Sequence, residues 1–122
     1  MDIKEFNNAI ETLKDNLGKG LTACDIRITG TGKSIAGFNV DTKLTAVLEQ
    51  VTDYISKMLK DADLPELQDY YLMDFDDGSL AIVLITDKYQ WLILINKKET
   101  NLGFLLNVAI PDAHKALMKV LK

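Results

Sequence analysis

The sequence predicts an α/β (α+β) fold: a five-stranded, mainly antiparallel sheet between helical layers, in the order α-β-β-α-β-β-β-α. Two segments, 3–17 and 44–59, carry apolar residues at helical spacing. Three consecutive strand-like segments between residues 67 and 96 are separated by tight-turn signals, as in an antiparallel meander. Segments 80–85 and 91–95 are apolar at every position, which indicates strands covered on both faces.

Composition sets the class of protein. The 122 residues predict a single domain, 1–122, in which 1–18 is an N-terminal helix. A net charge of −4 and a sole arginine, Arg27, argue against nucleic acid as a partner. The single cysteine, Cys24, excludes an internal disulfide and fits a reducing, cytoplasmic compartment. No apolar run approaches the roughly 20 residues of a membrane helix, so no membrane insertion is expected.

The first half of the chain predicts a helix and a hairpin. Asp2 is a suitable helix cap, and Gly18 suits a left-handed helix end. Strands follow at 21–29 and 34–39, joined by a glycine-rich turn. The helix is predicted to bury Ile3, Phe6, Ile10, Leu13 and Leu17, and the first strand to turn Cys24, Ile26 and Ile28 to one face.

A second helix, 41–61, is predicted to begin at the cap residue Asp41. Its apolar stripe is roughly 140° wide at 100° per residue, broader than the ~100° that one surface helix needs. We therefore expect it to pack on its own sheet and to leave apolar surface at its margin. The stripe comprises Leu44, Val47, Leu48, Val51, Tyr54, Ile55, Met58 and Leu59.

The meander comprises predicted strands 67–75, 79–86 and 89–96. The first of these is expected at an edge of the sheet. The last segment, 101–122, allows two interpretations. Its unbroken periodicity favours one long helix kinked at Pro111. The alternative is a sixth strand at 103–110, with the proline opening a short helix.

The glycine-rich turn resembles a phosphate-binding loop only superficially. That motif needs glycine at position 27, where this chain has Arg27, and a helix after Ser34, where the pattern predicts a strand. Aspartates within 74–77 lack the glycine and glutamate that a calcium loop requires. We therefore expect hairpin turns at both places and no metal site.

No catalytic constellation is recognisable. His114, the only histidine, has no companion ligand nearby in the sequence and is interpreted as a helix-surface residue. Cys24 lies among apolar neighbours and is interpreted as a small buried hydrophobe. The sequence thus predicts no enzyme, no catalytic residue and no cofactor.

Two short motifs, Gly32-Lys33-Ser34-Ile35-Ala36 and Thr100-Asn101-Leu102-Gly103, occur within this order of elements. The first is similar to the hairpin turn and return strand, and the second to the opening of the final helix, in the Roadblock family of dynein light chains and bacterial and archaeal GTPase partners. The likeness covers residues 20 to 122. It implies a profilin/Roadblock-like fold, a homodimer whose sheet continues between subunits, and a scaffold or regulator of a Ras-like small GTPase.

This interpretation assigns two surfaces. The dimer interface is predicted at Tyr54, Ile55, Met58, Tyr70, Tyr71, Leu72 and Met73. By analogy with the family, the partner binds Glu49, Gln50, Asp53 and Lys57. Antiparallel pairing of 67–75 with its copy is predicted to centre on residue 71 or 72, which keeps like charges apart. The alternative function is a small-molecule sensor of PAS/profilin-like plan.

Overall fold

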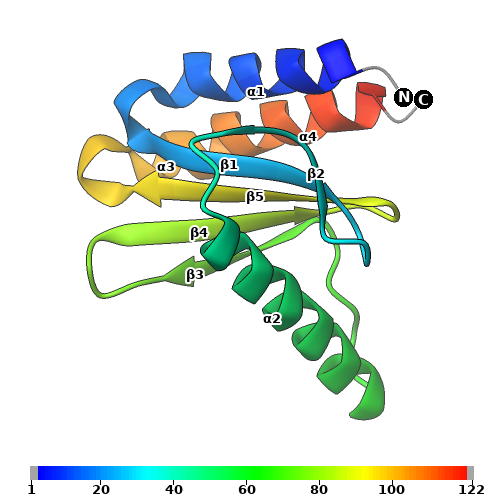
Figure 1. Cartoon of the computed structure of the whole chain (residues 1–122). Helices are drawn as coiled ribbons and strands as arrows, with labels where there is room; N and C mark the ends of the chain where they lie inside the picture. Colours follow the sequence, from blue (N-terminus) through cyan, green and yellow to red (C-terminus); the bar gives the residue numbers. More distant parts are fainter. Residues whose placement is uncertain (1–2, 121–122) are drawn as a thin grey trace.

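The computed structural model describes residues 3–120 (Figure 1). Its strands are β1 (Leu21–Ile28), β2 (Lys33–Phe38), β3 (Tyr70–Asp74), β4 (Ser79–Ile85) and β5 (Tyr89–Asn96). Its helical elements are α1 (Ile3–Leu17), α2 (Thr42–Asp61), α3 (Leu102–Phe104), a π turn η3 (Leu105–Ala109) and α4 (Ile110–Val120). Short 3₁₀ turns lie at η1 (Gly18–Gly20) and η2 (Lys97–Glu99). The predicted element order is therefore confirmed.

The five strands form one antiparallel sheet in the order β2-β1-β5-β4-β3. β3 is an edge, as predicted, but it begins at Tyr70 and not at residue 67. The register of the β3–β4 pair explains the difference. Tyr70 pairs with Leu84, and each residue before Tyr70 lies opposite a residue one position later than the last in the β4–β5 hairpin. Residues 67 and 68 would lie opposite the turn that follows β4, where no partner strand remains.

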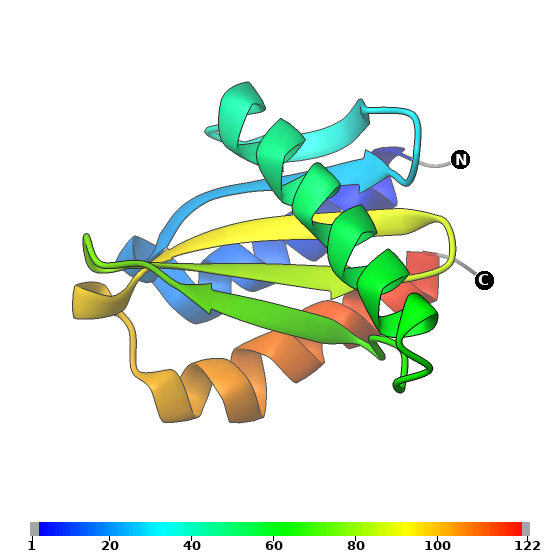
Figure 2. The ribbon, with the colours of Figure 1, turned by 90° about the horizontal axis from the view of Figure 1, so that it is seen from below.

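The helices cover both faces of the sheet (Figures 1 and 2). α1 and α4 pack together on one face, and α2 crosses the other face diagonally. Successive side chains of β4 point to opposite faces of the sheet. Leu80, Ile82 and Leu84 pack in the cluster under α1 and α4. Ala81 and Val83 join the α2 cluster. The prediction that apolar strands are covered on both faces is confirmed.

The N-terminal helix ends as predicted, with Gly18 in the left-handed region at a φ of 51°. Phe6, Ile10, Leu13 and Leu17 are buried, whereas Ile3 is exposed. The predicted cap, Asp2, lies outside the described residues.

Helix also occupies the last segment, so the alternative strand at 103–110 is wrong. The predicted kink takes the form of the π turn η3, in which the Ile110 N–H bonds to the carbonyl of Leu105. Pro111 follows directly. Proline has no N–H and its ring crowds the preceding turn, so a widened turn accommodates it without ending the helix.

Candidate functional site

The open edge of β3 is the first part of the candidate site. Backbone bonds from Phe75 to Ser79 and from Ile85 to Asp69 show that odd-numbered residues bond inward to β4. Because inward and outward bonding alternate along an antiparallel strand, the N–H and C=O groups of Tyr70, Leu72 and Asp74 point out of the sheet. This edge offers donors and acceptors for another strand.

The second part is the exposed apolar flank of α2. Only Thr45, Leu48 and Thr52 are buried in this helix. Val47, Tyr54 and Met58 are 51%, 67% and 53% exposed. At 100° per residue these three project from one flank of the helix. The predicted apolar margin of this helix is confirmed; its role in a dimer stays a prediction.

The strand and the helix are linked through Tyr71. Its hydroxyl lies 2.6 Å from the Thr52 hydroxyl, and burial raises the pKa of Tyr71 above its ordinary value. Tyr71 and Met73 pack into the α2 cluster, and Ile55 is half-buried. Tyr70 and Leu72 face the opposite side of the sheet and are 39% and 37% exposed. The predicted interface residues therefore lie on both faces of one edge.

Three of the four predicted partner-binding residues, Gln50, Asp53 and Lys57, are exposed. Glu49 is different. Its carboxylate lies 3.5 Å from the Arg27 guanidinium and its side chain is 15% exposed. The Glu49 side chain is thus directed toward β1 and mostly covered, and partner binding by these four residues stays a prediction.

Arg27 is almost fully buried beneath α2. One guanidinium nitrogen donates to the Thr45 hydroxyl at 2.6 Å and lies 3.5 Å from the Asp25 carboxylate. The other donates to the Gly32 carbonyl and approaches Glu49. Ser34 donates to Asp25. Sequence reasoning placed Arg27 in a strand but missed this cluster. Asp25 and Arg27 occupy alternate positions in β1, between buried apolar residues. This pattern could have indicated that both charged side chains lie on one covered face of the sheet.

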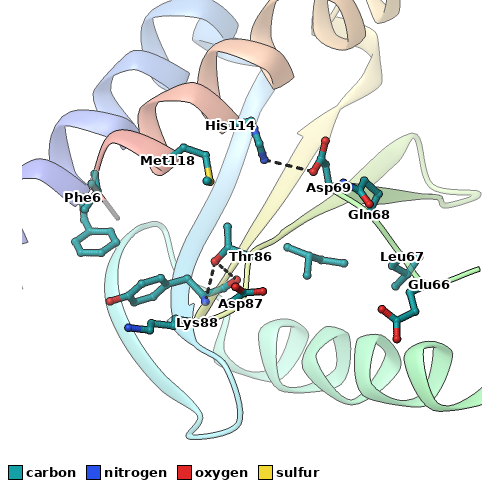
Figure 3. A pocket seen from close by; sticks show the side chains of 13 residues that line it. Phe6, Glu66, Leu67, Gln68, Asp69, Thr86, Asp87, Lys88, His114 and Met118 are labelled. Carbon is teal, nitrogen blue, oxygen red and sulfur yellow. Dashed lines mark hydrogen bonds and ion pairs between the residues drawn. The ribbon is translucent and has the colours of Figure 1, made fainter. Parts of the chain in front are cut away.

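A cleft of about 660 Å³ opens at the end of the sheet beside the β4–β5 turn (Figure 3). His114 of α4 lies on its rim, 3.6 Å from the carboxylate of Asp69, the residue before β3. Phe6, Met118 and Lys88 also line this cleft. His114 was expected on the surface of a helix. In the structure its side chain is half-buried and contacts Asp69, the residue that precedes β3.

Cys24 is 3% exposed, and burial raises the pKa of its thiol to about 11. It is thus a buried hydrophobe, as predicted, and a poor nucleophile. Among residues 3–120, no group of three or more His, Cys, Asp or Glu side chains is placed to hold a metal ion. No helix within the same range is long and apolar enough to cross a membrane.

Comparisons with known proteins give the fold a class. No family model matches the chain, and no curated protein matches its sequence. Solved structures do match. MglB of Myxococcus xanthus superposes with a TM-score of 0.82 at 14% identity, over 98% of this chain and 90% of that one. A Roadblock/LC7 domain from Streptomyces avermitilis superposes with a TM-score of 0.64 at 11% identity, over 91% of this chain and 95% of that one. The chain therefore has the Roadblock/LC7 fold.

The superpositions on MglB structures extend over nearly the whole chain. A further one, described as MglB with a tetrameric arrangement, superposes with a TM-score of 0.74 at 12% identity, over 95% of this chain and 89% of that one. The predicted Roadblock-like architecture is confirmed, including the N-terminal helix that precedes the sheet.

Proposed function

We propose that this chain is a non-catalytic, homodimeric protein-binding module that scaffolds or regulates a Ras-like small GTPase in the cytoplasm. One observation carries the proposal: α2, which bonds through Thr52 to Tyr71 of the unpaired edge strand β3, has an exposed apolar flank. An open edge favours pairing with another chain. A second copy that pairs there brings its own α2 alongside and removes both flanks from water.

The backbone geometry favours one register. With Leu72 on the two-fold axis, Leu72 pairs with Leu72 of the partner subunit, and Tyr70 pairs with Asp74 of the partner subunit. All three outward-facing residues of β3 then exchange backbone bonds. With Tyr71 on the axis, Asp74 has no counterpart within the partner's β3. Leu72 is therefore the preferred centre of the predicted pair.

The GTPase assignment rests on the Roadblock/LC7 fold and on what that family resemblance implies. Arg27 is the sole arginine and hence the sole candidate for a catalytic arginine finger. Its side chain is 10% exposed and contacts Thr45, Asp25, Gly32 and Glu49. This geometry supports scaffolding or reshaping of the GTPase and not insertion of an arginine into it.

Light scattering tests self-association, and pull-down with a GTPase encoded beside this gene tests the partner. We expect a dimer mass at micromolar concentration and capture of the GTPase. Asp53→Lys combined with Lys57→Glu should abolish capture but keep the dimer, whereas Asp15→Lys on α1 should change neither. A monomer mass would overturn the dimer; unchanged capture by the double variant would remove the α2 assignment.

A second candidate function, a small-molecule sensor, has one observation in its favour. The cleft beside His114 falls within the roughly 300–1,000 Å³ of ordinary ligand sites. A thermal-shift screen of nucleotides and metabolites separates the two functions. The leading proposal expects no shift from GTP or ATP, since β2 replaces the helix of a phosphate loop. A reproducible shift that Asp69→Asn removes would support the sensor.

A further inference from the structure

Three buried polar residues between α2 and β1 bond with two less buried neighbours to form one connected group, which we call the Arg27 cluster. The buried members are Asp25, Arg27 and Thr45; Glu49 is half-buried, and Ser34 on β2 is exposed. The side chains of Arg27 and Asp25 are only 10% and 1% exposed. Charges at such depth are costly unless they are paired and hydrogen-bonded. The group therefore holds its members in one arrangement.

Within this cluster, Arg27 connects three parts of the fold. It bonds to Asp25 in its own strand, to the Gly32 carbonyl in the exposed β1–β2 turn, and to α2. The contacts to α2 come from Thr45 and Glu49, one helical turn apart. A planar guanidinium can serve these directions together, whereas a lysine ammonium is a single point charge.

Fewer apolar side chains are fully buried under α2 than under α4, although Leu44 packs with Leu48 against the sheet. Of its three buried residues, two are threonines and only Leu48 is apolar. The opposite layer is different, because α4 buries Ile110, Ala113 and Leu117 in the larger cluster. The Arg27 contacts lie at the N-terminal half of α2, and the Thr52–Tyr71 bond lies further along the helix. The helix is thus held to the sheet by these polar contacts together with the apolar packing around Leu48.

We propose that Arg27 is the positioning residue of α2: its guanidinium fixes the N-terminal half of the helix to β1 and to the β1–β2 turn, and so sets where the apolar flank lies relative to the β3 edge. The structural part stands without the proposed dimer; the consequence for dimerisation rests on the proposed function.

Amide hydrogen exchange of the full chain tests this proposal. The variants are Arg27→Lys, Glu49→Ala and Thr45→Ala, with Lys43→Ala as the control on the exposed face of the same helix. Alanine has the highest intrinsic helix propensity, so faster exchange in the two alanine variants cannot come from a weaker helix former. They also keep Arg27 itself and provide readouts if Arg27→Lys fails to fold.

We expect Arg27→Lys and Glu49→Ala to speed exchange of amides 46–53 at least tenfold relative to amides 112–117 of α4, with a smaller effect from Thr45→Ala and none from Lys43→Ala. Equal acceleration in both helices, or none in α2, would overturn the positioning role. Dimer dissociation constants of the same variants test the consequence. If the wild-type chain is monomeric, the dimer proposal fails while the exchange result still decides the role of Arg27.

Discussion

Replacing Leu72 with proline removes one backbone N–H that points away from β4. The inward bonds of β3 come from odd-numbered residues, so the monomer keeps its β3–β4 ladder. Proline is accepted on edge strands for this reason. In the dimer centred on Leu72, the same N–H donates across the axis from each subunit. Two bonds are lost, at about 1 kcal/mol each, for a total of about 2 kcal/mol.

That loss corresponds to roughly a 30-fold weaker dimer. Sedimentation equilibrium over a concentration series measures it, and circular dichroism reports whether the monomer remains folded. Leu72→Ala keeps the N–H and should weaken the dimer less. Met73→Pro removes an N–H directed at β4 and should lower the melting temperature strongly. An unchanged dissociation constant in a folded Leu72→Pro variant would refute pairing through β3.

Three further predictions concern stability. Burial raises the pKa of the Cys24 thiol from 9.0 to about 11, so the folded state keeps the proton more tightly than the unfolded state. The resulting stabilisation is fully present below pH 9 and is lost as the pH rises toward 11. In urea titrations, Cys24→Ala should remove about 3 kcal/mol of this pH dependence. Thr52→Val leaves the Tyr71 hydroxyl without this partner and should cost about 1 kcal/mol in chemical denaturation. Gly20→Ala places a methyl group against Thr100 and the Glu99 carbonyl and should lower the free energy of unfolding by about 1–3 kcal/mol. Gly30→Ala is the control: its methyl group meets no atom within 4 Å, so only strain at the positive φ destabilises the fold.

Much of the fold follows from periodicity. Helical spacing identifies α1 and α2, and uninterrupted apolar runs identify β4 and β5 as strands with two covered faces. The start of β3 could not be predicted in this way. Its limit depends on where the neighbouring hairpin turns, a property of the sheet register and not of residues 67–69 themselves.

The candidate site was predictable only in part. The width of the α2 stripe indicates an exposed flank, and Val47, Tyr54 and Met58 provide it. The contact of Glu49 with Arg27 joins segments more than twenty residues apart, so local spacing cannot show it. The buried face of α2 also includes two threonines, which a stripe defined by apolar residues omits.

A cysteine scan of β3 tests the central claim, pairing of two copies through this edge, most directly. In a Cys24→Ala background, single cysteines at positions 69 to 74 are oxidised and the disulfide-linked dimers are quantified. Residues on the axis lie about 5.5 Å apart between Cα atoms, within disulfide range, and their neighbours lie too far from their own copies. We predict a sharp maximum at position 72. A maximum at 71 would keep the edge but shift the register, and a flat or absent profile would contradict the account.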